Sequence, residues 1–288
     1  MKSKNLFAFL ILSTLLFAPG ELSIAKNRAP SSSAYGPCSF ACDHIPDDAH
    51  VMHSFGESRQ DSLSSGRLSV LAWNLYKGRD SEFSSAFAKL SQNRDLILTS
   101  EAISADPVST AFEDVPDFGW NMAAAFEMKN NVATGTSIGS YAKAKNVHFY
   151  RTLDVEPYVK SPKSIVAAEY LLPNSNETLL VFSIHGINWN TDDALVRQLN
   201  MTMNEMMAHK GPIIFAGDFN IKNSTRLQMA IQTLGKAGLT RVPWENPNLK
   251  KQLDDAFTRG LKVNRARLIN DYIGLASDHP AIDLDLEY

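Results

Sequence analysis

Six short polar clusters along this chain carry side chains that could bind a divalent metal ion or move a proton. The last of them is the pentapeptide Ser277-Asp278-His279-Pro280-Ala281, close to the end of the sequence. The earlier ones are Trp73-Asn74, Ser100-Glu101, His185, Gly217-Asp218-Phe219-Asn220 and Leu253-Asp254-Asp255. Carboxylate and amide oxygens are the ligands that hard cations such as Mg²⁺ prefer, and histidine exchanges protons near neutral pH. The set therefore predicts metal-assisted hydrolysis of phosphate esters.

Several of these clusters follow an apolar run that is typical of a buried strand. The runs cover residues 68–73, 95–99, 179–184 and 212–216. A strand end presents polar side chains to a cleft instead of burying them. Taken singly, Asn74 could cap a turn, Glu101 could begin a helix, and His185 could be a hydrogen-bonded core histidine. Asp218 and Asn220 are more specific, because a glycine followed by a carboxylate and an amide places two oxygen-bearing groups on one turn.

The remaining elements must hold these strand ends in place. Helices are predicted at residues 82–90, 192–209 and 224–234, where apolar residues recur at spacings of three and four. Leu195, Leu199, Met203 and Met206 form one such stripe, which we expect to lie in the core. Further strands are predicted at residues 134–142, 165–172, 253–257, 261–269 and 281–286. Strands and helices mixed in runs, with a hairpin, predict an α/β sandwich of two sheets and not a strictly alternating parallel sheet.

The first 25 residues have the pattern of a secretory signal peptide. Lys2 and Lys4 precede an uncharged apolar run over residues 6–18, and small residues follow it. The run is too short to cross a bilayer of about 30 Å as a helix. We expect cleavage after Ala25, with Gly20 as the alternative, and export to the periplasm or beyond the cell without a retained membrane span.

Residues 26–66 are rich in serine and show little hydrophobic periodicity. This composition predicts an extension that lies over the domain or is partly disordered. This segment contains three histidines, His44, His50 and His53. Their spacing is not that of a zinc site, so we expect their side chains to be solvated.

The only two cysteines, Cys38 and Cys42, lie in the same segment, beyond the signal peptide. An oxidising destination favours a local disulfide between them. Two free thiols, or a metal site completed by Asp43 or His44, are the alternatives.

Composition limits the partners only weakly. The formal net charge is −3, the sequence pI is about 6.2, and hydrophobic residues make up 44% of the chain. These values are ordinary for a soluble globule of one large α/β domain. They give no overall basic surface for nucleic acid. A nuclease is not excluded, because a divalent cation can supply the positive charge that faces the phosphate.

In order and spacing, the polar clusters resemble the endonuclease/exonuclease/phosphatase superfamily. Its members include DNase I-like nucleases, abasic-site endonucleases, inositol polyphosphate phosphatases, neutral sphingomyelinases and the catalytic subunit of cytolethal distending toxin. The resemblance covers about residues 67–288 and looks closest to a bacterial branch of the superfamily. Its motifs are Ala72-Trp73-Asn74-Leu75-Tyr76-Lys77-Gly78, Gly217-Asp218-Phe219-Asn220, Leu253-Asp254-Asp255-Ala256-Phe257-Thr258-Arg259-Gly260-Leu261 and Ser277-Asp278-His279.

The resemblance implies a four-layer α-β-β-α sandwich and a Mg²⁺-dependent reaction, with Mn²⁺ as a substitute. It implies that Glu101 is the principal metal ligand, together with Asn74 and Asp278. By the same resemblance, His279 is the general base for the attacking water and Asp254 orients it. Asp218 and Asn220 position the scissile phosphate or the water, and His185 donates to the phosphoryl oxygens or the leaving group.

Three positions depart from the family pattern. Ser100 stands where the family usually has glutamine before the metal-binding glutamate. Both Asp254 and Asp255 could orient His279, and we choose Asp254 because it directly follows Leu253 as in the family. Glycine follows His185 where the family often has leucine, which makes the transfer of its role weaker than that of His279.

These features lead us to expect a monomeric, exported phosphodiesterase that acts on DNA or RNA. The first alternative is a phosphomonoesterase or phospholipase C-type enzyme acting on inositol phosphates or sphingomyelin. The second is a non-catalytic binding protein or toxin subunit on the same scaffold. A shared fold does not fix the substrate.

Overall fold

The computed structural model describes residues 30–64, 66–173, 175–247 and 252–288. The predicted signal peptide lies outside these residues. Within them the chain forms two mixed β-sheets. One sheet contains β1 (Met52–Gly56), β4 (Gly119–Met128), β5 (Val132–Ser140), β3 (Leu96–Ile103), β2 (Arg67–Asn74), β13 (Ala281–Glu287) and β12 (Lys262–Ile269), in that spatial order. The other contains β10 (Thr240–Arg241), β11 (Asp254–Arg259), β9 (Ile213–Asp218), β8 (Thr178–His185), β7 (Ser164–Leu171) and β6 (Ala144–Arg151).

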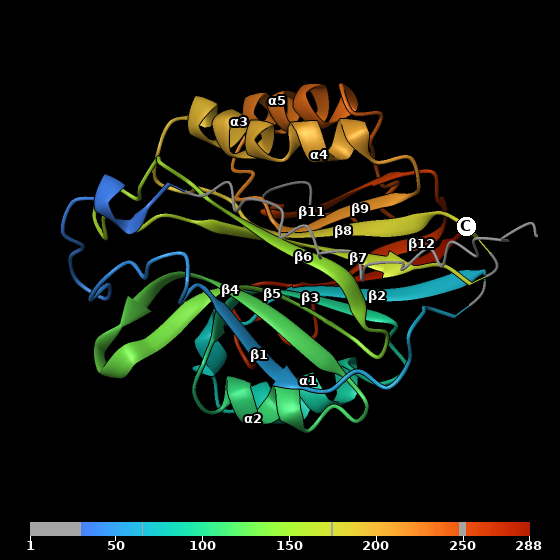
Figure 1. Ribbon diagram of the computed structural model, residues 1–288, viewed down its shortest axis with the longest axis horizontal. Coiled ribbons are helices and arrows are strands. Elements are labelled where there is room, and N and C mark those ends of the chain that lie inside the picture. The colour runs from blue at the N-terminus through green and yellow to red at the C-terminus, as the bar shows by residue number, and fades with distance from the viewer. Residues whose placement is uncertain (1–29, 65, 174, 248–251) are drawn as a thin grey trace, which may run out of the picture.

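Helices cover the outer face of each sheet, which confirms the predicted four-layer α-β-β-α sandwich (Figure 1). They are α1 (Phe83–Leu90), α2 (Val108–Glu113), α3 (Asp192–Met201), α4 (Met203–Ala208) and α5 (Ser224–Gly235), with short 3-10 turns at Ser32–Ala34, Tyr76–Gly78 and Lys129–Asn131. α1 and α2 lie on the seven-stranded sheet, and α3, α4 and α5 lie on the six-stranded sheet. No helix in the described part of the chain is long and apolar enough to cross a membrane.

Strand β2 shows why its sequence is apolar almost throughout. Side chains alternate between the two faces of a strand. Val70 and Ala72 pack between the sheets, whereas Leu71 and Trp73 pack against the helices α1 and α2. Both faces of the strand are therefore buried, and only its end can carry a polar group.

The two sheets are also joined by buried polar contacts. The hydroxyl of Ser183 on β8 donates to the backbone carbonyl of Thr99 on β3 at 3.1 Å. Ser164 on β7 donates to the carbonyl of Ala123 on β4 at 3.1 Å. Buried polar groups that find partners fix the relative position of the elements that carry them.

The predicted continuous helix over residues 192–209 is wrong. The structure divides it into α3 and α4, with the break at Thr202. The hydroxyl of Thr202 donates to the carbonyl of Leu199 at 2.8 Å, a local contact that competes with regular helix geometry. Leu195, Leu199 and Met206 nevertheless lie in the apolar core between the six-stranded sheet and its helices, and Met203 packs against this core, as predicted.

The sheet begins before residue 67, the start predicted for the catalytic domain. Strand β1 pairs with β4 in antiparallel register, from Met52 opposite Ala123 to Gly56 opposite Gly119. Its side chains are only partly buried because β1 is an edge strand, which explains the weak hydrophobic pattern in its sequence. Earlier in this segment, Cys38 and Cys42 form a disulfide.

Candidate active site

The predicted site residues converge on one cavity at an end of the sandwich. The cavity has a volume of about 360 Å³. Six of the predicted residues line it: Glu101, His185, Asp218, Asn220, Asp278 and His279. The other two, Asn74 and Asp254, lie behind it and hydrogen-bond to Asp218 and His279, respectively. Both sheets contribute, because β2 and β3 belong to one sheet and β8, β9 and β11 to the other.

His279 is held between two buried carboxylates. Its Nδ1 donates to Oδ2 of Asp254 at 2.8 Å, and its Nε2 lies 3.9 Å from Oδ2 of Asp218. Burial by itself lowers the pKa of His279, but the charges of Asp254 and Asp218 outweigh burial and raise that pKa well above its usual range. Burial also raises the pKa of Asp218, and His279 offsets part of that rise. The side chains thus form a hydrogen-bonded carboxylate-imidazole pair with a second carboxylate beside it.

The structure separates the two adjacent aspartates of β11. Asp254 lies opposite Asp218 in the strand register and contacts His279. Asp255 points to the other face, where it accepts hydrogen bonds from Nε of Arg241 at 2.7 Å and Nε1 of Trp244 at 3.1 Å. Of the two candidates, Asp254 is therefore the one in position to orient His279.

Asp255 should make the stability of the protein depend on pH. Burial raises its pKa to about 6, although Arg241 lowers it in part, against an ordinary value of 3.8. A carboxyl group whose pKa is raised by folding stabilises the native state below pH 4 and loses that contribution as the pH rises through about 6. The difference corresponds to about 3 kcal/mol. Relative to the wild type, Asp255→Asn should therefore gain stability between pH 4 and pH 6.

Denaturant unfolding of both proteins at several pH values measures this difference. A constant offset between wild type and Asp255→Asn from pH 4 to pH 8 would contradict the assignment. Asp271→Asn is the control, because this acid is exposed and its replacement should give an offset that does not vary with pH in this range.

Asn74 connects the two sheets at the edge of the site. Its amide nitrogen donates to Oδ2 of Asp218 at 3.0 Å, and its Oδ1 accepts from the backbone nitrogen of Tyr76 at 3.0 Å. The amide nitrogen of Asn74 thus orients the carboxylate of Asp218. The amide oxygen of Asn74 uses one lone pair for Tyr76 and keeps a second lone pair that could accept another bond.

Glu101 carries a negative charge in the cavity. Lys77 forms an ion pair with it. Burial alone would raise the pKa of Glu101, but Lys77, His185 and Lys163 lower that pKa to about 2. Asp278 lines the same cavity, and its pKa is raised by burial and by the negative charge of Glu101, although His279 lowers it in part. Two carboxylates therefore repel each other in a place where a cation would relieve the repulsion.

The backbone at Glu101 departs from the predicted end of a strand. β3 continues to Ile103, and a register shift between Thr99 and Ala102 leaves Glu101 in a bulge with φ of 52°. Asn220 also has a positive φ, of 53°. This conformation is tolerated by asparagine but is costly for glutamate, and a strained residue in a cavity is often functional. A bulge also turns a side chain that would otherwise follow the pleat toward the cavity.

The turn after β9 holds Asp218 and Asn220 in fixed positions. The backbone nitrogen of Asn220 donates to Oδ1 of Asp218 at 2.8 Å, and the side-chain nitrogen of Asn220 donates to the carbonyl of Gly186 at 2.9 Å. Gly217 has φ of +139°, and a Cβ there would lie 2.5 Å from the carbonyl oxygen of Ile184. Only glycine fits this position, which explains the glycine before the aspartate.

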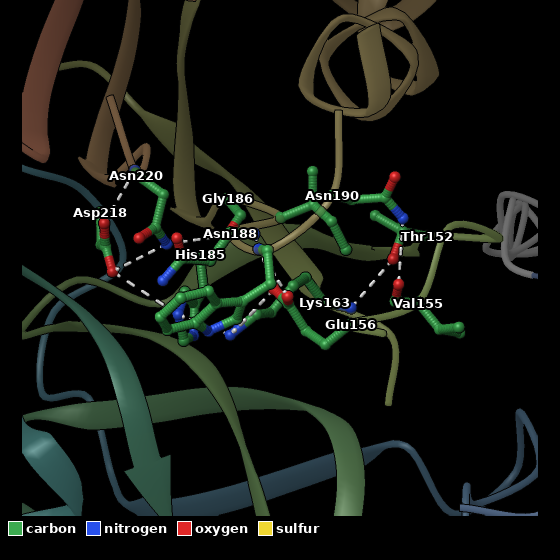
Figure 2. Close-up of polar contacts among 12 residues, drawn as sticks. Thr152, Val155, Glu156, Lys163, His185, Gly186, Asn188, Asn190, Asp218 and Asn220 are labelled. Carbon is green, nitrogen blue, oxygen red and sulfur yellow. Dashed lines mark hydrogen bonds and ion pairs between the residues drawn. The ribbon is translucent and has the colours of Figure 1, made fainter. Parts of the chain in front are cut away.

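His185 contacts Lys163, which in turn pairs with Glu156, and no sequence motif predicts either residue. Figure 2 shows Lys163 close to both His185 and Glu156. Nζ of Lys163 lies 2.8 Å from Nε2 of His185 and 3.7 Å from Oε1 of Glu156. Burial, followed by the charge of Lys163, lowers the pKa of His185 well below its usual value. A neutral His185 can therefore accept a hydrogen bond from Lys163. Burial lowers the pKa of Lys163, and the charges of Glu156 and Glu101 offset part of that decrease.

One group of carboxylate and imidazole side chains in the described residues is close enough to share a metal ion, namely Asp218, Asp254 and His279, whose ligand atoms lie within 4.8 Å of one another. This group differs from the predicted ligands Glu101, Asn74 and Asp278. Its imidazole Nδ1 is already used by Asp254, which favours proton transfer over metal ligation.

Lys77, Lys163 and Glu156 could not be found from strand ends alone. Lys77 stands in the motif that begins at Ala72, but the resemblance implies no role for it. Lys163 directly precedes β7, and Glu156 lies in a loop without a motif. A buried lysine costs free energy unless a carboxylate is near, but a sequence does not show which carboxylate that is.

Sequence comparisons identify relatives of this chain. No family model matches the chain. A UPF0294 protein from Vibrio campbellii is 32% identical over 222 residues, which cover 74% of this chain and 75% of that protein. A UPF0294 protein from Vibrio cholerae is 30% identical over 224 residues, with coverage of 74% and 75%.

Solved structures share the architecture at low sequence identity. An endonuclease/exonuclease/phosphatase family protein from Leptotrichia buccalis has a TM-score of 0.58 at 17% identity and covers 77% of this chain and 100% of its own. A mannosyl-6-phosphatase from Bacteroides thetaiotaomicron has a TM-score of 0.59 at 14% identity, with coverage of 77% and 100%. The predicted resemblance is thus confirmed at the level of the fold.

Proposed function

Because the chain belongs to the UPF0294 family and has the fold of endonuclease/exonuclease/phosphatase proteins, we propose that it is an exported, Mg²⁺-dependent phosphodiesterase that cleaves nucleic acid. One observation carries the proposal: the buried pair of His279 and Asp254 faces Asp218 in a cavity that also contains Glu101 and Asp278. A proton-transfer group and paired carboxylates in one cavity are what metal-assisted phosphoester hydrolysis requires.

His279 is the general base in this proposal. It takes a proton from the attacking water at Nε2, while Asp254 holds its Nδ1 and stabilises the imidazolium that forms. Asp218 and Asn220 position the water and the phosphate. Lys163 donates to a phosphoryl oxygen, and neutral His185 orients Lys163 through its Nε2.

The side chains present in the cavity fit a divalent cation. Glu101 and Asp278 line the cavity with hard oxygen donors, and the charge of Glu101 raises the pKa of Asp278. The amide oxygen of Asn74, behind the cavity, is the third predicted donor. When bound, the cation would neutralise charge on the phosphoryl oxygens and help His279 lose its proton. Lys77 would have to leave Glu101 to make room, because its ammonium group occupies that carboxylate.

Export is proposed from two features. The first 25 residues have the composition of a signal peptide, and Cys38 and Cys42 form a disulfide, a bond typical of oxidising compartments. A phosphomonoesterase is the second candidate, because one protein of the same fold is a mannosyl-6-phosphatase.

Hydrolysis should depend fully on a divalent cation. We expect the protein to cleave supercoiled plasmid, single-stranded DNA or RNA with Mg²⁺, and to lose this activity when a chelator removes the ion. The same assay should include sphingomyelin, inositol phosphates and mannose 6-phosphate. Cleavage confined to a phosphomonoester would replace the nuclease with the second candidate, and an intact panel would refute both.

A further inference from the structure

Trp189 lies at the rim of the proposed active-site cavity with most of its side chain exposed. Its exposed fraction is 63%, and it lines the same cavity as Glu101 and His279. Tyr158, which is 68% exposed, forms a T-shaped pair with it, with ring centroids 6.4 Å apart and an angle of 80° between the ring planes. A large aromatic face open to solvent beside a polar cavity is a surface on which a flat ring can stack.

Hydrogen bonds to buried side chains fix the backbone of the loop that carries Trp189. The buried carboxylate of Glu156 accepts the backbone N–H groups of Asn188 at 2.6 Å and Trp189 at 2.7 Å. The backbone nitrogen of Ile187 donates to Oε1 of Gln198 at 2.8 Å. Figure 2 shows Glu156 and Asn188 side by side, with Asn190 bound to the carbonyl of Val155. Because these contacts fix the backbone, Trp189 is positioned before any ligand arrives, which lowers the entropic cost of binding.

The chemistry around the ring indicates a polar, planar ligand. Nζ of Lys222 lies over one face of the Trp189 ring, 5.0 Å from its centre, so a flat ligand would stack on the other face or displace this ammonium group. Oδ1 of Asn188 is buried at the cavity, and no hydrogen-bond partner for it exists in the described parts of the chain. A buried acceptor without a partner is costly, so the Asn188 side chain would gain a hydrogen bond by turning toward a ligand that offers an N–H or O–H donor. Hydrocarbon chains of a lipid offer no such donor.

We propose that Trp189 and Asn188 form a subsite for the nucleobase next to the scissile phosphate, with the base stacked on Trp189 and one of its donors directed to Asn188. The inference rests on the proposed function, because it assumes that the cavity binds the phosphate. The group that flanks the bound phosphate is then a nucleobase. Stacking on an aromatic side chain tolerates every base, since each base has a flat face.

Binding of two phosphates that differ only in the base tests this subsite. Calorimetry with chelator present, so that no turnover occurs, compares adenosine 5′-monophosphate with ribose 5-phosphate. We expect the nucleotide to bind about tenfold more tightly to the wild type. Trp189→Ala should remove this preference, and Trp189→Phe should keep most of it. Met207→Ala is the control, because Met207 is an exposed apolar residue on α4 that does not line the cavity.

Three results would overturn the subsite. Equal affinity of the wild type for the two phosphates would show that the base makes no contact. An unchanged preference in Trp189→Ala would place the base elsewhere. Loss of sedimentation with phosphatidylcholine and phosphatidylglycerol vesicles in Trp189→Ala, with nucleotide binding intact, would make Trp189 a lipid contact. Binding is measured without hydrolysis, so failure of the nuclease proposal and failure of the subsite are distinguished.

Discussion

Replacing His279 by asparagine should lower the rate of metal-dependent hydrolysis by about 10³-fold. Asparagine can still donate to Asp254 but cannot accept a proton from water. In the wild type the imidazole lies 2.8 Å from Asp254 and is almost fully buried, so no other side chain can move into its place without rearrangement. Steady-state rates at saturating Mg²⁺ for wild type and variant measure the loss.

Two comparisons separate a chemical effect from a structural one. His50→Asn should hydrolyse at the wild-type rate, because His50 is exposed, pairs with Asp47 and does not line the cavity. Asp254→Asn should lose activity while leaving His279 in the protein, since it removes the orienting carboxylate. Retention of more than a tenth of the activity in His279→Asn, with normal circular dichroism, would mean that another group accepts the proton.

The second large effect is expected for Glu101→Gln, which should reduce both Mg²⁺ affinity and turnover. Glutamine keeps the size of the side chain but removes the charge that attracts the cation. Loss of several kcal/mol of charge stabilisation corresponds to about 10²- to 10³-fold in rate. Calorimetric titration with Mg²⁺ and steady-state rates measure the two quantities on the same protein.

Lys77→Met should change the Mg²⁺ affinity in the opposite direction to Glu101→Gln. Because the ammonium group of Lys77 pairs with Glu101, its removal should strengthen Mg²⁺ binding. Glu113→Gln, a change at an exposed acid on α2, should alter neither quantity. If Glu101→Gln binds Mg²⁺ as well as the wild type, the cation must lie elsewhere, and the group of Asp218, Asp254 and His279 becomes the candidate.

Strands with both faces buried could be predicted from the sequence, because their apolar runs are continuous. β2, β8 and β9 were predicted close to their observed positions. β4 was missed, since residues 119–128 mix alanine, glycine and polar residues. Three alanines of β4 are buried, in contact with β1, β5 or the core, and alanine carries no clear strand signal.

The arrangement of the site was predictable only in part. Polar residues at strand ends, with the motifs of a known superfamily, identified the side chains that the structure brings to one cavity. The contacts among them follow from how two sheets meet, which no single segment encodes. Lys163 is an example, because its partner His185 lies on the neighbouring strand and Glu156 in a loop. The choice between Asp254 and Asp255 needed the register between β11 and β9.

The position of the site across two sheets has a mechanical consequence. His279 is fixed to the seven-stranded sheet, where its backbone carbonyl accepts a hydrogen bond from Nε1 of Trp73 on β2, whereas Asp254 belongs to the six-stranded sheet. If one sheet slid against the other, these two side chains would separate while every strand kept its hydrogen-bonded neighbours. Catalysis would then stop in a molecule with intact secondary structure. Loss of activity before any loss of secondary structure would therefore be the expected sign of movement between the sheets, as distinct from the unfolding of either one.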